Sequence, residues 1–328
     1  MENKLPFENA NRQIIVKKNA KTSESYGKDP YLRSVEELID YGIINVNKPK
    51  GPTSHQTSAY LQEILGINKS GHSGTLDPNV TGVLPIATAR ATRIVQGLLI
   101  AGKEYVGIMH MHKNLSDAEL KKGIDAFKGR IKQLPPIKSN VKRAWRFRTI
   151  YYFEVLDREE KEVLFKVGCQ AGTYIRKLIH DFGQKMNIGA NMTQLIRTKA
   201  GPFKIDDSFT LHDVADALHI YKTENNDKFI RKVVRPIEEA VSHLPKVWVL
   251  DSTVDSICHG SALAMPGIAK LNSRIEKEEI VAVMTLKDEL VALGDASMTT
   301  KEMVANEKGI AVRITKVFML PGTYPKIA

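Results

Sequence analysis

Four side chains of this 328-residue chain could act together on one substrate: a carboxylate, an arginine and two tyrosines. The carboxylate, Asp77, lies in a stretch from Gly71 to Ile86 whose Gly and Pro residues fix an irregular backbone path. Arg176 falls in the first turn of a predicted helix but off its apolar stripe. A cation is unfavourable there beside the helix dipole, which suggests an anionic partner. Tyr105 and Tyr174 complete the set. A carboxylate beside an arginine stays ionised, so Asp77 suits a nucleophile or an electrostatic stabiliser better than a general acid.

A simpler interpretation stays open, because Asp-Pro is a common turn-forming pair and Asp77 could merely shape a loop. The glycine-rich stretch lacks both GxxxxGK[ST] and the GxGxxG spacing, which argues against a nucleotide-phosphate cradle. No GxSxG nucleophile elbow is present. His110 and His112 could share one strand face, but without a third ligand we predict ordinary strand residues and no metal site.

The composition indicates the class of partner. The net charge is +11 and the isoelectric point about 9.4, which favours polyanions, with nucleic acid ahead of anionic membrane. The two cysteines, Cys169 and Cys258, form no CxxC pair, as expected in a reducing cytoplasm. The N-terminus has no apolar stretch typical of a signal peptide. The most apolar run, near residues 95–101, is too short to span a bilayer.

A basic segment from residue 134 to residue 148 is the second candidate for contact with a polyanion. Five cations and two aromatic residues lie within the eleven residues from Lys138 to Arg148. The alternation of Arg with apolar residues predicts that Arg146 and Arg148 share one strand face. The segment could be a solvated edge strand or a phosphate-tracking loop with aromatic rings available for stacking, and the overall charge favours the second.

Helices and strands on both sides of Asp77 must position these residues. We predict a strand at 42–46 and a helix that Thr53 or Ser54 caps and Gly66 ends. Further predictions are a helix near 89–98, a strand at 103–111, a helix from Ser116 to about 127, and a hairpin over 151–167. A helix capped by Thr173 then carries the stripe Ile175, Leu178, Ile179, Phe182 and Met186. Thr210 and Asp213 predict a capping box for the next helix.

Near Leu244-Pro245 the pattern changes to short strands, which predicts a small β-rich second domain. Its expected strands are 247–250, 280–286, 290–293 and 309–317, and its expected helices are 251–258 and 300–305. The first forty residues are polar and basic, and the run 14–16 could add one strand to a neighbouring sheet. The sequence does not decide whether this arm is a disordered tail or docks on a domain.

Five blocks in order resemble the signature of the TruB/dyskerin family of pseudouridine synthases. They are Lys48-Pro49-Lys50-Gly51-Pro52-Thr53-Ser54, Gly71-His72-Ser73-Gly74-Thr75-Leu76-Asp77-Pro78 with Thr81–Pro85, Lys103-Glu104-Tyr105, Gly172–Arg176, and Leu195–Thr198. The segments 258–260 and 266–269 resemble the RNA-binding PUA domain. The likeness covers nearly the whole chain from residue 42. The long arm, the segment 141–143 and the full PUA domain are similar to archaeal members of the dyskerin type, which work in H/ACA ribonucleoprotein particles.

The resemblance implies that Asp77 is the catalytic nucleophile and that Arg176 pairs with it. Tyr105 would stack on the flipped uracil, and Tyr174 would assist at the base, in proton removal from C5. His72 would hold the target nucleotide out of its stack, and Leu195 would line the pocket. No metal or organic cofactor is implied.

The resemblance also implies an RNA-binding surface. The substrate-binding residues would be Lys48, His72, Leu195, Arg197, Lys142, Arg143 and Arg146, with the segment 129–148 as a loop that closes over the RNA. His259, Gly260, Pro266 and Gly267 of the PUA domain would grip the ACA end of a guide RNA or the acceptor end of tRNA. The implied substrates are rRNA, selected by an H/ACA guide RNA, and the T-arm uridine of tRNA without a guide; both modes stay open.

The implied partners are three small accessory proteins, of glycine-arginine-rich, zinc-ribbon-like nucleolar and kink-turn-binding ribosomal types, and no membrane. A non-catalytic RNA-binding scaffold is the alternative from another class. The expected fold is α+β, with a mixed, mostly antiparallel sheet and a β-barrel-like PUA domain. The expected divisions are an arm, 1–41, packed on the PUA domain; a catalytic domain, 42–245; the PUA domain, 246–322; and a tail, 323–328.

Overall fold

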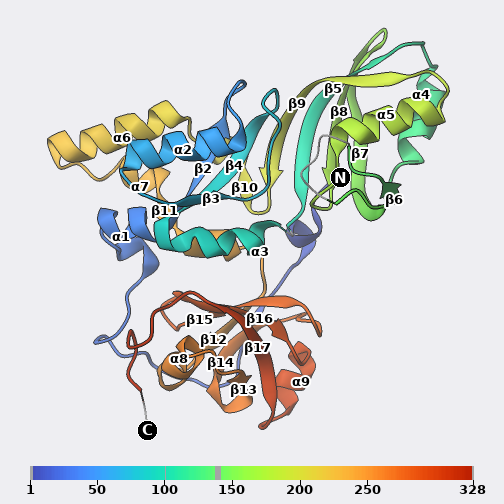
Figure 1. Cartoon of the computed structure of the whole chain (residues 1–328). Helices are drawn as coiled ribbons and strands as arrows, with labels where there is room; N and C mark the ends of the chain where they lie inside the picture. Colours follow the sequence, from blue (N-terminus) through green and yellow to red (C-terminus); the bar gives the residue numbers. More distant parts are fainter. Residues whose placement is uncertain (1–2, 100, 137–141, 327–328) are drawn as a thin grey trace.

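Two β-sheets organise the computed structural model, which describes residues 3–99, 101–136 and 142–326. A ten-stranded sheet with flanking helices forms the upper part of Figure 1, and a seven-stranded sheet forms the lower part. Within these described ranges each sheet contains one parallel pair of named strands, and its other pairs are antiparallel. The predicted α+β class and the mixed, mostly antiparallel sheet are therefore confirmed.

The larger sheet has two halves that meet at the strand after the Asp77 loop. Its order is β11 (Arg235–Pro236), β2 (Gly42–Lys48), β4 (Thr81–Thr88), β9 (Ala190–Ala200), β5 (Lys103–Met111), β8 (Glu162–Cys169), β7 (Arg146–Glu159) and β6 (Gly129–Gln133), with β3 (Ser70–His72) on β4 and β10 (Phe203–Lys204) on β9. The parallel pair β4–β9 joins the halves through Thr81 opposite Ile196 and Gly82 opposite Arg197. Asp77 lies just before this junction.

Each half of the larger sheet has its own helices (Figure 1). On the β2–β4 half lie α1 (Val35–Asp40), α2 (Ser54–Leu65), α6 (Leu211–Glu224) and α7 (Ile230–Val233), and on the other half lie α4 (Asp117–Asp125) and α5 (Ile175–Lys185). The chain crosses between the halves through η3 (Ala89–Ile94) and α3 (Val95–Leu99). Short 3-10 turns are η1 (Pro6–Asn9), η2 (Pro30–Leu32), η4 (Ile205–Asp207), η5 (Ile237–Val241) and η6 (Met265–Gly267). No helix in the part of the chain that the structure describes has the length and apolar character to cross a membrane.

Helix ends follow the local capping chemistry in most places. Thr53 caps α2 through the amide of Gln56, and Gly66 ends the helix with φ +67°, a conformation that favours glycine. Ser116 and Thr210 cap α4 and α6 as predicted. The prediction that Thr173 caps α5 is wrong, because the helix begins one residue later and Tyr174 takes the N-cap position.

The segment 129–148, predicted as a loop, begins and ends as two paired strands, so that prediction is wrong for its ends. β6 pairs antiparallel with the start of β7, from Gly129 opposite Ile150 to Gln133 opposite Arg146. Arg146 and Arg148 share one face of β7, as predicted, and Phe147 lies on the other. Residues 137–141, which include Lys138 and Val141 of the basic segment, lie outside the described residues.

The smaller sheet combines the C-terminal part of the chain with one strand of the arm. Its order is β1 (Ile14–Val16), β14 (Ile268–Asn272), β12 (Lys246–Val249), β15 (Ile280–Met284), β16 (Leu290–Ala296), β17 (Ile310–Val317) and β13 (Leu263–Ala264), with α8 (Asp251–Cys258) and α9 (Thr300–Ala305) beside it. The strand predicted at 14–16 is confirmed, and it pairs antiparallel with β14. β13 and β14 were not predicted, because the Met-Pro-Gly turn between them separates two very short apolar runs.

The arm docks on both sheets rather than on the smaller one alone. Leu5 is fully buried against Gly102, next to β5 of the larger sheet. In the middle of the arm the Lys17 ammonium donates to the Met303 carbonyl at 2.6 Å, and the Thr22 hydroxyl donates to Asp251 at 3.0 Å. At its end α1 buries Val35 and other residues against β2 and β4. The arm therefore crosses from one sheet to the other and back.

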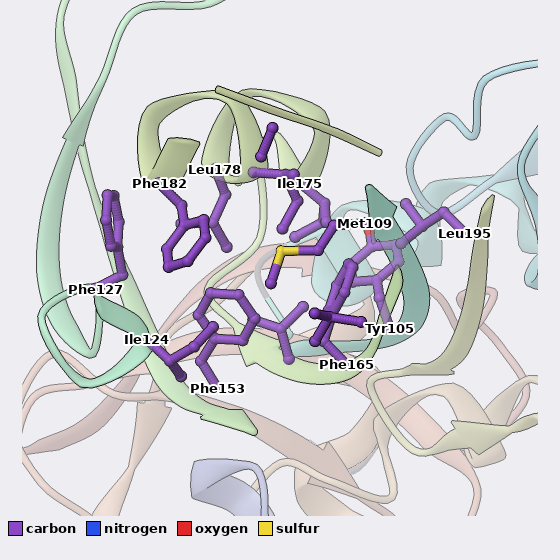
Figure 2. Packing of buried hydrophobic residues seen from close by; sticks show 14 of the residues in the cluster. Tyr105, Met109, Ile124, Phe127, Phe153, Phe165, Ile175, Leu178, Phe182 and Leu195 are labelled. Carbon is purple, nitrogen blue, oxygen red and sulfur yellow. The ribbon is translucent and has the colours of Figure 1, made fainter. Parts of the chain in front are cut away.

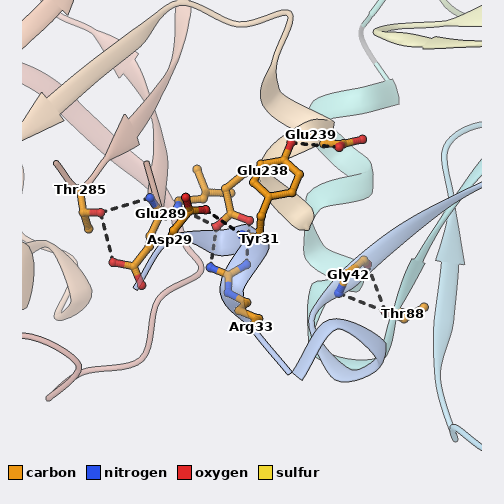
Figure 3. A network of polar contacts seen from close by, with 10 residues as sticks. Asp29, Tyr31, Arg33, Gly42, Thr88, Glu238, Glu239, Thr285 and Glu289 are labelled. Atoms are coloured by element: carbon orange, nitrogen blue, oxygen red, sulfur yellow. Dashed lines mark hydrogen bonds and ion pairs between the residues drawn. The ribbon is translucent and has the colours of Figure 1, made fainter. Parts of the chain in front are cut away.

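A buried ion pair joins the arm to both sheet regions (Figure 3). The Arg33 guanidinium donates to the two carboxylate oxygens of Glu238 at 2.7 and 2.8 Å, and both side chains are only 9% exposed. The Leu290 amide of β16 donates to the same carboxylate at 3.0 Å. One carboxylate from η5 thus binds both the arm and the smaller sheet.

Candidate active site

Asp77 lies between two residues that anchor its loop in the core of the larger sheet. Leu76 and Val80 are buried in one hydrophobic cluster with Tyr105, Leu195 and Ile175. Figure 2 shows Tyr105 and Leu195 beside each other at the edge of this cluster, with Ile175 at the start of the neighbouring helix. A single packed core therefore sets the positions of the loop, of the strands β5 and β9, and of the first turn of α5.

Asp77 and Arg176 form an ion pair across this arrangement, with Nη2 of the arginine donating to Oδ2 of the carboxylate. The side chains are 54% and 58% exposed, so a polymeric substrate could reach them. An ion pair this exposed contributes little to folding. Its consequence is local: it fixes the direction of the one carboxylate on the loop.

The backbone of the Asp77 loop is held by Lys48, which is fully buried. Its ammonium donates to the carbonyls of Pro49, Pro78 and Val80 at 2.8, 3.2 and 2.9 Å. Burial, and to a lesser degree the Arg197 charge, lowers the pKa of Lys48. The prediction that Lys48 contacts substrate is wrong, because all three donor directions of the ammonium are used inside the protein.

Ser54 holds the other anchor of the loop and was missed as a site residue. The Leu76 amide donates to the Ser54 hydroxyl oxygen at 2.8 Å, and the hydroxyl donates to the Leu76 carbonyl at 3.2 Å. Ser54 is fully buried at the start of α2. In the sequence, Ser54 could be interpreted as a helix-capping residue, and that interpretation gave no reason to expect a contact with the Asp77 loop.

Arg197 is a second buried cation with a structural position, and the prediction that it contacts substrate is wrong. It is 1% exposed, with Nε donating to the Val83 carbonyl at 2.7 Å and Nη2 to the Gly74 carbonyl at 3.2 Å. Gly82 permits this packing: its φ is +103°, and a Cβ there would lie 2.3 Å from the Arg197 carbonyl oxygen. Arg197 therefore ties β9 to both ends of the Asp77 loop.

The two tyrosines differ in exposure. Tyr105 is 7% exposed on β5, opposite Arg197 of β9, and burial raises the pKa of its hydroxyl, so it stays protonated at neutral pH. Tyr174 is half-buried, and its amide and carbonyl are both hydrogen-bonded to the Gln133 side chain, at 3.1 and 3.2 Å. Gln133 of β6 thereby fixes Tyr174, two residues before Arg176, a contact that the sequence did not indicate.

His72 is half-buried on β3, close to a second histidine. The His72 and His55 rings meet edge to face with centroids 5.0 Å apart. Burial first, and then the His55 and Arg197 charges, lower the pKa of His72 to about 4. The ring is therefore neutral at neutral pH, and its buried Nδ1 has no hydrogen-bond partner within the described residues.

Because the pKa of His72 is lowered, the free energy of unfolding should fall as the pH is lowered. Its pKa of about 4 in the folded chain lies below the ordinary value of about 6.5, so the unfolded chain binds the proton first. The free energy of unfolding should carry this contribution fully above pH 6.5 and lose it as the pH falls toward 4. Urea unfolding of wild type, His72→Asn and the surface control His219→Asn at pH 7 and pH 5 measures it. The His72 variant should lose less stability than wild type; equal losses would contradict the assignment.

The two faces of the strand pair β6–β7 have different neighbours. On one face the Arg148 guanidinium lies against Gly172, in the turn before α5. Nη2 of Arg146, which is half-buried, donates to the Lys142 carbonyl at 3.2 Å, while Lys142 and Arg143 are exposed. On the other face cations cover two exposed rings: Arg130 over Phe147 at 4.0 Å and Lys132 over Trp145 at 5.0 Å.

Three of the four predicted PUA residues lie on the surface of the smaller sheet region, and the fourth does not. His259 and Gly260 follow α8 and are exposed, and Pro266 is exposed with its carbonyl bound by Lys18 at 2.5 Å. Gly267 is buried, and a Cβ there would lie 2.6 Å from the Thr253 side chain. The prediction that Gly267 contacts RNA is wrong, since close packing explains this glycine.

His110 of β5 and His112, just after that strand, have ordinary partners. Nδ1 of His110 is hydrogen-bonded to Glu162, and Nε2 of His112 to Asn191 at 2.9 Å. Within the described ranges no group of three or more His, Cys, Asp or Glu side chains is arranged to hold a metal ion.

Comparison with known families gives four consecutive matches. A model described as TruB family pseudouridylate synthase (N terminal domain) matches residues 62–175, and one for the tRNA pseudouridylate synthase B C-terminal domain matches residues 176–242. A PUA domain model matches residues 245–318, and a DKCLD (NUC011) domain model matches residues 2–58. Together they span almost the whole chain in the order of its structural regions.

Curated relatives and solved structures agree with these matches. The probable tRNA pseudouridine synthase B of Nanoarchaeum equitans is 52% identical over 323 residues, which are 98% of this chain and 92% of that protein. Its counterpart in Pyrococcus abyssi is 51% identical over 318 residues, 96% of this chain and 95% of that protein. A chain in the crystal structure of a Cbf5-Nop10-Gar1 complex has a TM-score of 0.93 and 49% identity, covering 99% of both chains. One in an H/ACA RNP bound to a substrate RNA containing 2′-deoxyuridine has a TM-score of 0.91 and 47% identity, covering 98% and 99%.

Proposed function

The chain belongs to the TruB family of pseudouridine synthases, and we propose that Asp77, Arg176, Tyr105 and Tyr174 carry out its reaction on RNA. It is an isomerase that converts uridine in RNA to pseudouridine. The assignment of residues rests on the exposed Asp77–Arg176 ion pair. The neighbours of this pair in the chain, Leu76 and Ile175, pack in the same hydrophobic core as Tyr105. A loop fixed at both ends by buried groups is the kind of rigid support that a nucleophile needs.

The isomerisation requires one bond to break and one to form at the ribose. The N1–C1′ bond of uridine breaks, the uracil rotates, and a C5–C1′ bond forms; C5 loses its proton and N1 ends protonated. Asp77 acts as the nucleophile, and Arg176 keeps its carboxylate ionised and directed. Tyr174, at the start of α5 beside Arg176, assists the loss of the C5 proton.

Access to the ribose requires the nucleotide to leave its stack, which costs a few kcal/mol. Tyr105 and Leu195, adjacent in Figure 2, offer the flat and apolar surface on which the flipped base rests. His72, neutral at neutral pH, lies on the strand before the loop and supports the displaced nucleotide without placing a charge beside Asp77.

We propose both substrate modes for this chain. The relatives' names point to tRNA, whereas the solved structures point to an H/ACA particle that contains Nop10 and Gar1. The match over 99% of both chains supports partners of these two types. A kink-turn-binding protein and a guide RNA would complete the set, with rRNA as the guided substrate.

Tritium release from RNA that carries 5-tritiated uridine distinguishes these possibilities. The enzyme alone with free tRNA tests the mode without a guide, and the enzyme with guide RNA and accessory proteins tests the guided mode. Release in neither assay by wild type would favour the rival, a non-catalytic RNA-binding scaffold.

We propose the divisions 42–245 for the catalytic domain and 246–322 for the PUA domain, with 323–328 as a tail and residues 1–41 as an arm shared by both.

The two cysteines, Cys169 and Cys258, are buried free thiols, which supports work in a reducing cytoplasm. On the PUA side we propose that His259, Gly260 and Pro266 contact the end of the RNA, because all three are exposed, the first two after α8 and Pro266 in the turn between β13 and β14.

Arg146→Ala tests RNA contact by the strand pair. Together with Lys142 and Arg143, Arg146 supplies positive charge at the end of β7, so its loss should weaken RNA binding. The slope of log affinity against log salt should become shallower by about 0.7–0.9, the share of one phosphate contact. Filter binding over a salt series measures it, with Lys122→Ala on α4 as control. An unchanged slope would count against phosphate contact by Arg146.

A further inference from the structure

A groove lies where the arm meets both sheet regions, away from the Asp77 loop. Its volume is about 480 Å³, within the range of small-ligand sites. Residues from the arm, the larger-sheet region and the smaller sheet line it: Phe7, Glu8, Ala10, Arg12, Ile14, Pro202, Lys204, Ser242, His243, Leu244, Lys246, Trp248 and Asn272. A second depression of about 330 Å³ shares five lining residues with it, so the two are continuous beside the arm: Phe7, Ala10, Arg12, His243 and Leu244.

The groove offers positive charge that the protein leaves unpaired. Among the described residues neither the Lys204 nor the Lys246 ammonium makes an ion pair, although they come from different sheets. Arg12 pairs with Glu279, but its buried Nε has no partner in the described part of the chain. The carboxylate in the lining, Glu8, already accepts from Lys199 at 3.0 Å and from the Leu5 amide at 2.7 Å. The free charge in the groove is therefore positive, which suits a phosphate.

Beside these cations the groove has a wall of rings. The Phe7 and His243 rings meet edge to face with centroids 5.7 Å apart. Both ring nitrogens of His243 are buried, so the ring meets the groove through its carbon atoms. Burial lowers the pKa of His243 to about 4, so the ring is neutral and adds an uncharged surface beside Phe7. A nucleobase, which has flat apolar faces and polar edges, fits such a wall.

The groove occupies a separate place on the smaller sheet. Lys246 and Asn272 lie at one end of the antiparallel pair β12–β14, whereas Pro266 and Gly267 lie at the other end. A ligand in the groove would thus contact the smaller sheet at the end nearer to β10 and the rest of the larger sheet, on the opposite side from the exposed PUA residues.

We propose that this groove binds a ribonucleotide, with its phosphate on Lys204 and Lys246 and its base beside Phe7 and His243. The nucleotide comes either from the bound RNA, as an unpaired residue between the catalytic and PUA regions, or from a free 5′-mononucleotide. The first source rests on the proposed function, in which RNA is the substrate. The second does not depend on it.

The double variant Lys204→Ala/Lys246→Ala in the full chain tests the phosphate half. Loss of the one phosphate contact that the two lysines share should make the salt slope for binding of a tRNA transcript shallower by about 0.7–0.9 and weaken binding about 10-fold at low salt. The control is Lys121→Ala/Lys222→Ala, which removes two exposed lysines elsewhere and should keep the wild-type slope. Single-turnover tritium release at saturating tRNA should be the same in both, because neither pair lies at Asp77.

Equilibrium dialysis with radiolabelled 5′-UMP and 5′-AMP identifies the source. Retention by wild type and loss in the groove variant would assign a free mononucleotide. A shallower tRNA slope without mononucleotide retention would assign a nucleotide of the RNA. Phe7→Leu tests the base half, with weaker binding expected at an unchanged slope.

A groove variant with the slope of the control, together with no mononucleotide retention by wild type, would overturn the proposal. That failure is distinct from failure of the proposed function, which would appear as absent tritium release by wild type. A groove that fails in an active enzyme leaves the roles at Asp77 untouched.

Discussion

Asp77→Asn should reduce tritium release by about 10⁴-fold or more, to the background of the assay. The amide has nearly the shape of the carboxylate but is a poor nucleophile, and it carries no charge to pair with Arg176. The loop should keep its position, since Lys48, Ser54 and Arg197 hold it through backbone groups. RNA affinity should therefore change little, and the loss should fall on the rate of the chemical step under single-turnover conditions.

Asp181→Asn provides a matched control, because it makes the same change in a carboxylate on α5 that pairs with a lysine of its own helix. This variant should react at the rate of wild type. Equal rates for Asp77→Asn and wild type would remove Asp77 as the nucleophile and leave it a residue that shapes the loop.

Glu238→Gln should lower the free energy of unfolding by about 3–5 kcal/mol. The change leaves the Arg33 guanidinium buried without a counter-charge, at the point where the arm and the two sheets meet (Figure 3). The double variant Arg33→Met/Glu238→Met should be less destabilised than Glu238→Gln, because no buried charge is left unpaired. Denaturant unfolding followed by fluorescence of the buried Trp248 measures both.

An exposed ion pair provides the comparison for this effect. Lys128 and Asp125 are 42% and 48% exposed, so Lys128→Met should change stability by only about 0–1 kcal/mol. A loss of that small size in Glu238→Gln would show that the buried pair does not hold the two sheet regions together.

Elements that depend on local chemistry could be predicted from the sequence. Helix α2 has its start and its end encoded by Thr53 and Gly66, and each works through neighbours in the chain. The strand from Lys103 to Met111 and the capping box of Thr210 were predicted for the same reason. The pairing of Asp77 with Arg176, by contrast, joins residues 99 positions apart; the residue types made it one option, and the family resemblance implied it directly.

The sequence could not predict which cations are buried. In a chain of this charge a lysine or an arginine near the site suggests contact with RNA, and that interpretation is wrong for Lys48 and Arg197. An irregular loop has carbonyl groups that no strand or helix satisfies, and these two side chains supply the missing donors, to Pro78 and Gly74. This need depends on the folded path of the backbone, which no spacing along the chain expresses.

The β6–β7 pair was missed for a related reason. Its strands hold basic residues, which are typical of loops, but Gln133 binds the start of α5 and Ile131 packs against the core of the larger sheet. Tertiary contact decides the structure there, over local preference.

The Asp77 loop is held through its main-chain groups. Its backbone conformation therefore depends little on its own exposed side chains. Thr75 and Asn79 point to solvent within it, whereas the groups that fix its shape belong to distant parts of the chain. In evolution or in protein engineering, the loop would thus keep its conformation only together with Lys48, Ser54 and Arg197. A transplant of the glycine-rich stretch alone into another sheet would carry the nucleophile but not the scaffold that aims it.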